Sequence, residues 1–204
     1  MTTARLARAT GLAFACAAVT PALAQAPGRG IVDRYAVGAV KADFNASQRI
    51  GGRRAGLVCL PAGSFKWSDA RTGLIEARSA IATVLHDQMP DTVDAADDPF
   101  SDEHGATRYK IIATLDDVSL NACVRNWGLA AKLKHNHALS GRGHIAVTWQ
   151  VFDRTTRSSV AHSTIVTDFD LPQDTEDAAA ALTVGLKINA GQFARQQWPA
   201  VRGL

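Results

Sequence analysis

The sequence predicts an α+β fold, a two-layer domain in which an antiparallel sheet carries two helices on one face. Two observations lead to this prediction. Three strand-like segments follow one another between residues 109 and 169 without a helical pattern between them, and strands connected in this way pair as antiparallel neighbours. One amphipathic helical pattern precedes this group and another follows it, so each helix has an apolar stripe to bury against the sheet.

The segments before this group are less regular. Residues 33–44 alternate weakly, which is compatible with a strand, whereas residues 45–56 have the glycine and polar content of a loop. The run from Leu57 to Leu60 is continuously apolar and ends at Pro61, so we expect a strand that is buried on both faces.

The first helix is expected to begin at a cap formed by Asp69 or Thr72 and to end after Met89, because Pro90 cannot continue it. Its apolar stripe consists of Leu74, Ala77, Ile81, Val84 and Leu85. A stretch with seven carboxylates follows, from Asp87 to Glu103. It does not match the ligand spacing of a calcium loop, so we expect an exposed connection, with calcium binding as the alternative.

The first of the three strands changes phase at Asp116–Asp117, where the apolar residues switch from one parity to the other, and this indicates a β-bulge. The second strand alternates most clearly, and the third is rich in β-branched residues. Apolar residues of the second strand are Ile145, Val147, Trp149 and Val151. On its opposite parity and in the third strand, the residues expected on the uncovered face of the sheet are His144, Thr148, Gln150 and His162.

The last helix is expected to be capped by Asp174 or Thr175 and to end at Trp198–Pro199. Its apolar face consists of Leu182, Leu186, Ala190 and Phe193.

The first 26 residues are typical of a cleaved export signal, with two arginines, a short apolar run and small residues before Ala24 and Ala26. The apolar run is shorter than the roughly 20 residues that span a bilayer, so we expect no transmembrane segment. A lipid-attachment cysteine directly follows the apolar run and small residues, whereas Cys16 lies inside the run and Phe14 precedes it, so we do not expect a lipoprotein. We therefore predict a periplasmic protein with one domain, residues 27–204.

The charge of this domain is close to neutral. The whole chain has 22 basic and 19 acidic residues, and the signal contains two of the basic residues and none of the acidic ones. A nucleic-acid-binding domain normally shows a clear basic excess, so this class of partner is not expected.

Two cysteines remain after the signal, Cys59 and Cys123. In an oxidising compartment they are expected to form a disulfide, with two buried free thiols as the alternative. No CxxC pair occurs in the sequence, so a thiol oxidoreductase is not indicated.

Three histidines gather near the second strand: His135, His137 and His144. Three imidazoles suit zinc or copper, but nearby lysines and Arg142 would repel a cation. We therefore expect a solvated loop and no cofactor, and keep a metal-binding protein as the alternative function.

No familiar catalytic motif occurs. The segment "AGSF" around Ser64 lacks the second glycine of a nucleophile elbow, and neither HExxH nor a phosphate-binding glycine loop is present. We expect a protein without enzymatic activity. A hydrolase with an unrecognised carboxylate site is a further alternative.

The segment "VTWQVFDRTTRSSVAHST" resembles the strand–turn–strand of the α/β domain shared by the TolB amino-terminal domain, the curli export lipoprotein and the lipoprotein activators of peptidoglycan synthases. The segments "CLPAG" and "LNAC" look like a cysteine pair found in periplasmic domains of this kind. The resemblance implies a protein-interaction module in cell-envelope assembly or trafficking, whose partners are envelope proteins. The exposed turn would supply the contact residues, namely Arg154, Thr155, Thr156 and Arg157.

Overall fold

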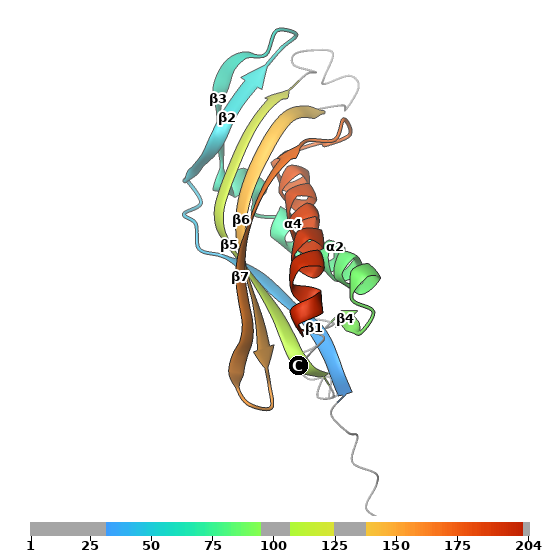
Figure 1. The fold of residues 1–204 in the computed structure, drawn as a ribbon. Helices are drawn as coiled ribbons and strands as arrows, with labels where there is room; N and C mark the ends of the chain where they lie inside the picture. The colour runs from blue at the N-terminus through green and yellow to red at the C-terminus, as the bar shows by residue number, and fades with distance from the viewer. Residues whose placement is uncertain (1–31, 95–106, 125–137, 202–204) are drawn as a thin grey trace, which may run out of the picture.

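The computed structural model describes residues 32–94, 107–124 and 138–201. The predicted export signal, His135 and His137 lie outside the described residues, as does most of the acidic stretch. Within the described ranges, one mixed sheet of seven strands is covered on one face by helices (Figure 1). The strands are β1 (Val32–Ala42), β2 (Arg49–Ala55), β3 (Leu60–Lys66), β4 (Thr92–Asp94), β5 (Thr107–Val124), β6 (Leu139–Asp153) and β7 (Ser158–Asp170).

The three consecutive strands β5, β6 and β7 form the predicted antiparallel meander. The prediction of a wholly antiparallel sheet is wrong, because β1 runs parallel to both β4 and β5, and β2 runs parallel to β5. Parallel strands require a long crossover, which usually contains a helix. The helix that follows β3 provides this crossover. β1 and β2 pair with one edge of β5, and β6 pairs with its opposite edge.

Two of the early segments also differ from their predictions. The segment expected to be a loop contains β2, and the apolar run expected to be a buried strand is the turn between β2 and β3. Cys59 in this turn has a left-handed φ of 51°. Continuous apolar composition suits a buried strand, but it does not reveal whether other elements cover the segment, and here no described element does.

The predicted bulge in β5 is confirmed. The register between β5 and β6 shifts between Leu115 and Asp117. Before the shift Ile111, Ala113 and Leu115 are buried, and after it Val118 and Leu120 are buried. The extra residue therefore keeps apolar side chains on the helix side along all 18 residues of β5.

Three described helices, α1 (Trp67–Ala70), α2 (Gly73–Gln88) and α4 (Ala178–Val201), lie on the same side of the sheet (Figure 1). The boundaries of α2 agree with the prediction, with Thr72 before it and Met89 after it. α4 continues through Pro199 to Val201, so its predicted end is too early. The predicted apolar face of α4 is buried, as are the apolar residues predicted for β6.

The core lies between the helices and β5–β6. Trp149 stacks on Phe193 with ring centroids 4.7 Å apart, which joins the centre of β6 to α4. Beside this pair, Asn189 of α4 is fully buried and accepts a hydrogen bond from the indole Nε1–H of Trp149 at 2.7 Å. The amide Nδ2 of Asn189 donates to the carbonyl oxygen of Ile165 and to the hydroxyl of Thr167.

Candidate functional site

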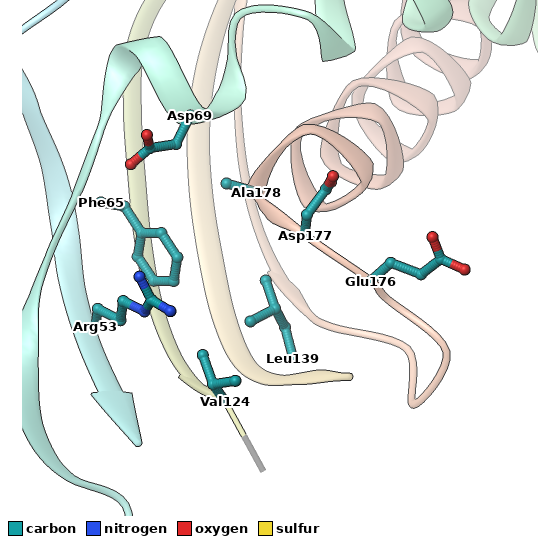
Figure 2. Close-up of a pocket in the computed structure, with 8 residues that line it drawn as sticks. All are labelled: Arg53, Phe65, Asp69, Val124, Leu139, Glu176, Asp177 and Ala178. Carbon is teal, nitrogen blue, oxygen red and sulfur yellow. The ribbon is translucent and has the colours of Figure 1, made fainter. Parts of the chain in front are cut away.

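One end of the molecule, which we call the distal end, brings together segments that are far apart in the sequence. The β2–β3 hairpin, the end of β5, the start of β6 and the start of α4 meet there, at the top of Figure 1. They enclose an open groove of about 410 Å³, shown in Figure 2. Its lining residues are Arg53, Phe65, Asp69, Val124, Leu139, Glu176, Asp177 and Ala178.

The floor of this groove is apolar. Phe65, Val124 and Leu139 are all at least 94% buried and come from β3, β5 and β6. They belong to the same cluster as the core, so the sheet and α4 hold them in place. The floor is therefore a fixed apolar surface at the end of the core.

The rim of the groove carries charges of both signs. Arg53 lies on the β2 side and Glu176 on the α4 side, as Figure 2 shows. Two other carboxylates already have structural roles. Asp69 accepts a hydrogen bond from the backbone N–H of Lys66, and Asp177 accepts one from the backbone N–H of Ala180 at the start of α4.

Arg53 and Glu176 are both exposed, and neither side chain forms a hydrogen bond or ion pair with another described residue. An apolar floor between a cationic and an anionic side chain suits a ligand with an apolar anchor and polar ends. The sequence does not reveal this groove, because its lining comes from four separate segments. The only sequence signal is the polarity of Arg53 and Glu176, which exposed residues commonly share.

The predicted contact residues Arg154–Arg157 form the turn between β6 and β7, at the opposite end of the molecule (Figure 1). All four are exposed. The backbone N–H of Arg154 donates to the carbonyl oxygen of Arg108, and Arg157 adopts a left-handed φ of 54°. The turn thus has a defined shape, and its role in partner binding stays a prediction.

The buried residue Asp153 holds this turn in its conformation. Asp153 is 1% exposed, and its carboxylate forms an ion pair with Arg108 at 3.0 Å and accepts hydrogen bonds from the backbone N–H groups of Thr155 and Thr156. Burial alone would raise the pKa of the Asp153 carboxyl. The hydrogen bonds from Arg108, Thr155 and Thr156, together with the charge of Arg108, outweigh burial and hold this pKa below its usual range.

The histidine prediction is tested only at His144. Its imidazole lies on the face of the sheet that the helices leave uncovered, with Nδ1 2.8 Å from Asp168 and Nε2 3.7 Å from Asp117. Among the described residues, no group of three or more His, Cys, Asp or Glu side chains has the arrangement of a metal site. Because His135 and His137 lie outside the described residues, metal binding stays an alternative.

The predicted disulfide is confirmed. Cys59 and Cys123 are bonded, with their Cα atoms 5.5 Å apart. The bond ties the β2–β3 turn to the end of β5. Consecutive residues of a strand point to opposite faces, so Arg53, opposite Ala122, lies on the groove side. Arg54 pairs with Cys123 and shares the outer face with the disulfide.

No helix in the described part of the chain is both long enough and apolar enough to cross a membrane.

Comparison with known proteins yields only remote likeness. No protein-family model and no curated protein matches the sequence. Among solved structures, a Xanthomonas campestris protein of family DUF330 is 12% identical, with 87% of this chain and 90% of that chain covered and a TM-score of 0.45. A putative lipoprotein from Caulobacter crescentus is 16% identical over 62% of this chain and 81% of its own, with a TM-score of 0.32.

A third match, a minor lipoprotein from Acinetobacter baumannii, is 10% identical, covers 83% of this chain and 95% of its own, and has a TM-score of 0.33. Likeness at this level identifies neither a family nor a function, and the specific resemblance to the TolB group is not confirmed. The prediction that the chain is not a lipoprotein is corrected here. Two of these structures are named lipoproteins, so the exclusion of a lipid anchor is not supported.

Proposed function

We propose that this protein is a non-enzymatic interaction module of the cell envelope, which binds a segment of a partner protein in the distal groove. The groove itself carries this proposal. It combines a buried apolar floor with Arg53 on one side and Glu176 on the other. Such a surface is complementary to an extended segment that inserts an apolar side chain and places a carboxylate against Arg53.

The size of the groove favours a short segment over a whole domain. About 410 Å³ accommodates a few side chains, and the opening is bounded by the β2–β3 hairpin and α4, which both belong to the folded domain. A preformed site of this kind binds without a large ordering cost on its own side. Assembly or trafficking of envelope components is the role that we assign to such binding.

The placement in the envelope rests on two features of the chain. The first 26 residues have the composition of an export signal. The Cys59–Cys123 disulfide is of the kind that persists in oxidising compartments outside the cytosol.

The test is crosslinking in intact cells, followed by purification of the tagged protein and mass spectrometry of the captured proteins. Wild-type protein, Arg53→Glu and Lys187→Glu would be compared. Lys187→Glu is the matched control, because it makes the same charge reversal at an exposed residue of α4 that does not line the groove. We expect one recurrent envelope protein with wild type and control, and its loss with Arg53→Glu.

The captured protein would then be purified and its affinity measured by calorimetry. We expect Arg53→Glu to weaken binding by about tenfold, because the introduced carboxylate would repel the carboxylate that the partner segment places at this side of the groove. Equal capture by all three proteins would exclude the groove. Loss of capture only after replacement of Arg154–Arg157 would move the site to the β6–β7 turn. Capture of nothing above a control exported protein would contradict an interaction module altogether.

A further inference from the structure

The turn between β2 and β3 exposes an unusual amount of apolar surface. The side chains of Leu57, Val58 and Leu60 are 99%, 76% and 63% exposed. Three of the six large apolar side chains that are exposed in the described part of the chain thus fall within four consecutive residues. The other three, Ile75, Val166 and Ile188, lie on α2, β7 and α4. Clustered exposure of this kind marks an interaction surface, whereas scattered exposure does not.

The disulfide fixes this turn at the end of β5. Cys59 lies between Val58 and Leu60 and is bonded to Cys123 at the end of β5. The backbone N–H of Gly56 donates to the carbonyl oxygen of Val124, and that of Cys59 donates to the carbonyl oxygen of Gly56. The turn is therefore tied to the domain at Gly56 and at Cys59, and Leu57 and Val58 between these two residues are exposed.

The charge of the hairpin is entirely positive. Residues 49–66 contain Arg49, Arg53, Arg54 and Lys66 and no acidic residue, and all four basic side chains are exposed. After residue 26 the chain has 20 basic and 19 acidic residues, so outside this hairpin 16 basic residues face 19 acidic ones. The positive charge of a nearly neutral domain is thus concentrated in the hairpin with the apolar turn.

Acidic groups at the distal end lie outside the hairpin. Asp69, which lines the groove, already accepts a hydrogen bond from the backbone N–H of Lys66. Asp170, at the end of β7, forms a surface ion pair with Arg142 at 3.1 Å. Glu176 and Asp177 lie across the groove, on the α4 side. Arg54 lies on the outer face, the side of the sheet away from this groove, together with the disulfide.

We propose that the β2–β3 hairpin docks the protein on an anionic phospholipid surface. Leu57, Val58 and Leu60 enter the boundary between headgroups and acyl chains, and the hairpin's basic side chains outside the groove, namely Arg49, Arg54 and Lys66, pair with lipid phosphates. Apolar side chains flanked by lysine and arginine are the pattern of interfacial membrane binding. The turn projects at the end of the hairpin (Figure 1), so its shape suits a deformable lipid surface, whereas a protein partner would need a matching concave pocket.

This surface is distinct from the groove, and its test does not depend on the groove. The purified, unacylated and oxidised protein would be sedimented with vesicles of phosphatidylglycerol and phosphatidylcholine, or of phosphatidylcholine alone. We expect binding to the vesicles that contain phosphatidylglycerol, and at least about tenfold weaker binding to those without it. The double variant Leu57→Ser/Val58→Ser should lose binding by about tenfold or more, because it removes apolar side chains that enter the membrane.

Ile75→Ser is the matched control, because Ile75 is 80% exposed on α2, away from the hairpin. Since all three replaced side chains are exposed, each variant should unfold at the same denaturant concentration as wild type. Arg49→Gln/Arg54→Gln tests the charge without altering the groove residue Arg53. This variant should bind less, and should respond less to salt, since raising NaCl from about 0.1 M to about 1 M shortens the Debye length from about 10 Å to about 3 Å.

Absence of binding to phosphatidylglycerol vesicles would overturn the proposal. Equal binding by wild type and Leu57→Ser/Val58→Ser would do the same, as would an equal loss in Ile75→Ser. If the turn variant instead loses a captured protein while wild type ignores vesicles, the surface binds protein and the lipid proposal is wrong. The groove proposal is unaffected by each of these results, because it is judged with Arg53→Glu.

Discussion

Asn189 shows how a single polar residue connects the two layers. It lies on the apolar side of α4, between Leu186 and Phe193, and is fully buried. Its side chain satisfies the indole N–H of Trp149 and a backbone carbonyl of β7. Through Thr167, whose hydroxyl donates to Gln192, the network returns to α4. Sequence periodicity reveals that Asn189 interrupts an apolar stripe, but the partners are known only from the structure.

Asn189→Leu should lower the free energy of unfolding by about 1–3 kcal/mol, because it leaves the buried Trp149 N–H and the Ile165 carbonyl without partners. The measurement is urea unfolding followed by tryptophan fluorescence. Lys187→Leu introduces the same side chain at an exposed position of α4 and should change the free energy by no more than about 0.5 kcal/mol. Equal stability of the two variants would contradict the structural role of Asn189.

Asp153 should make stability depend on acid pH. Because its folded-state pKa lies below the unfolded value, the carboxylate stabilises the fold above the unfolded pKa of about 3.9, and this contribution is lost as pH falls through the folded value. Wild type should therefore be more stable than Asp153→Asn at neutral pH, and the difference should shrink in acid. The measurement is the denaturant midpoint of wild type and of Asp153→Asn, taken at several pH values from neutral to acid. Asp170→Asn, at an exposed ion pair, should show almost no difference at either pH.

At the scale of elements, two helices approach each other closely at Gly73, the first residue of α2. A Cβ atom at Gly73 would lie 2.3 Å from the carbonyl oxygen of Ala179 in the first turn of α4. The hydroxyl of Thr183 also donates to the carbonyl oxygen of Gly73. α2 and α4 are thus in backbone contact, at the end of the helix layer that borders the groove residue Ala178.

Gly73→Ala should lower the free energy of unfolding by about 1–3 kcal/mol, since the backbone of α4 must move to admit the methyl group. Gly191→Ala is the control. Its methyl group would meet only side-chain atoms, the nearest being Nε2 of Gln88 at 3.3 Å, and alanine favours a helix over glycine by up to about 1 kcal/mol. We expect Gly191→Ala to be neutral or stabilising in the same unfolding assay. Destabilisation of equal size in both variants would contradict the close contact at Gly73.

The elements differ in how well the sequence predicts them. β5, β6 and β7 pair with chain neighbours, so their alternation is enough to place them, and even the bulge beside Asp116 is visible in the sequence. β2 and the turn at Leu57–Leu60 were misassigned for opposite reasons. β2 contains glycines and arginines that resemble a loop, and the turn is apolar without being covered. Local composition describes a segment but does not reveal what packs on it.

At the scale of the whole molecule, the disulfide joins the β2–β3 hairpin to β5, the strand that pairs with β1, β2 and β6. The two cysteines are 64 residues apart in sequence. This pairing was predicted because only two cysteines follow the export signal. The groove was not predicted, because it requires the relative positions of β2, β3, β5, β6 and α4. Those positions depend on the parallel pairings that the sequence pattern does not display.

Cys59→Ser/Cys123→Ser should lower the free energy of unfolding by about 2–5 kcal/mol, because the open chain gains entropy when unfolded. Guanidinium unfolding under oxidising conditions measures the difference. With added reductant, wild type should approach the stability of the variant, and the variant itself should not change. A variant as stable as oxidised wild type would contradict a structural role for the bond.

The parallel pairing of β1 with β5 has a consequence for the order in which the structure forms. Val32 lies opposite Thr107 and Arg53 opposite Ala122, so neither β1 nor β2 can pair with β5 until the residues of that strand have emerged. Before that point only the β2–β3 hairpin and the short β1–β4 pair have partners within reach. Distant pairings of this kind slow folding towards the millisecond-to-second range. The first half of the protein therefore has an unpaired strand edge until β5 is present, and the mixed sheet is completed late in folding.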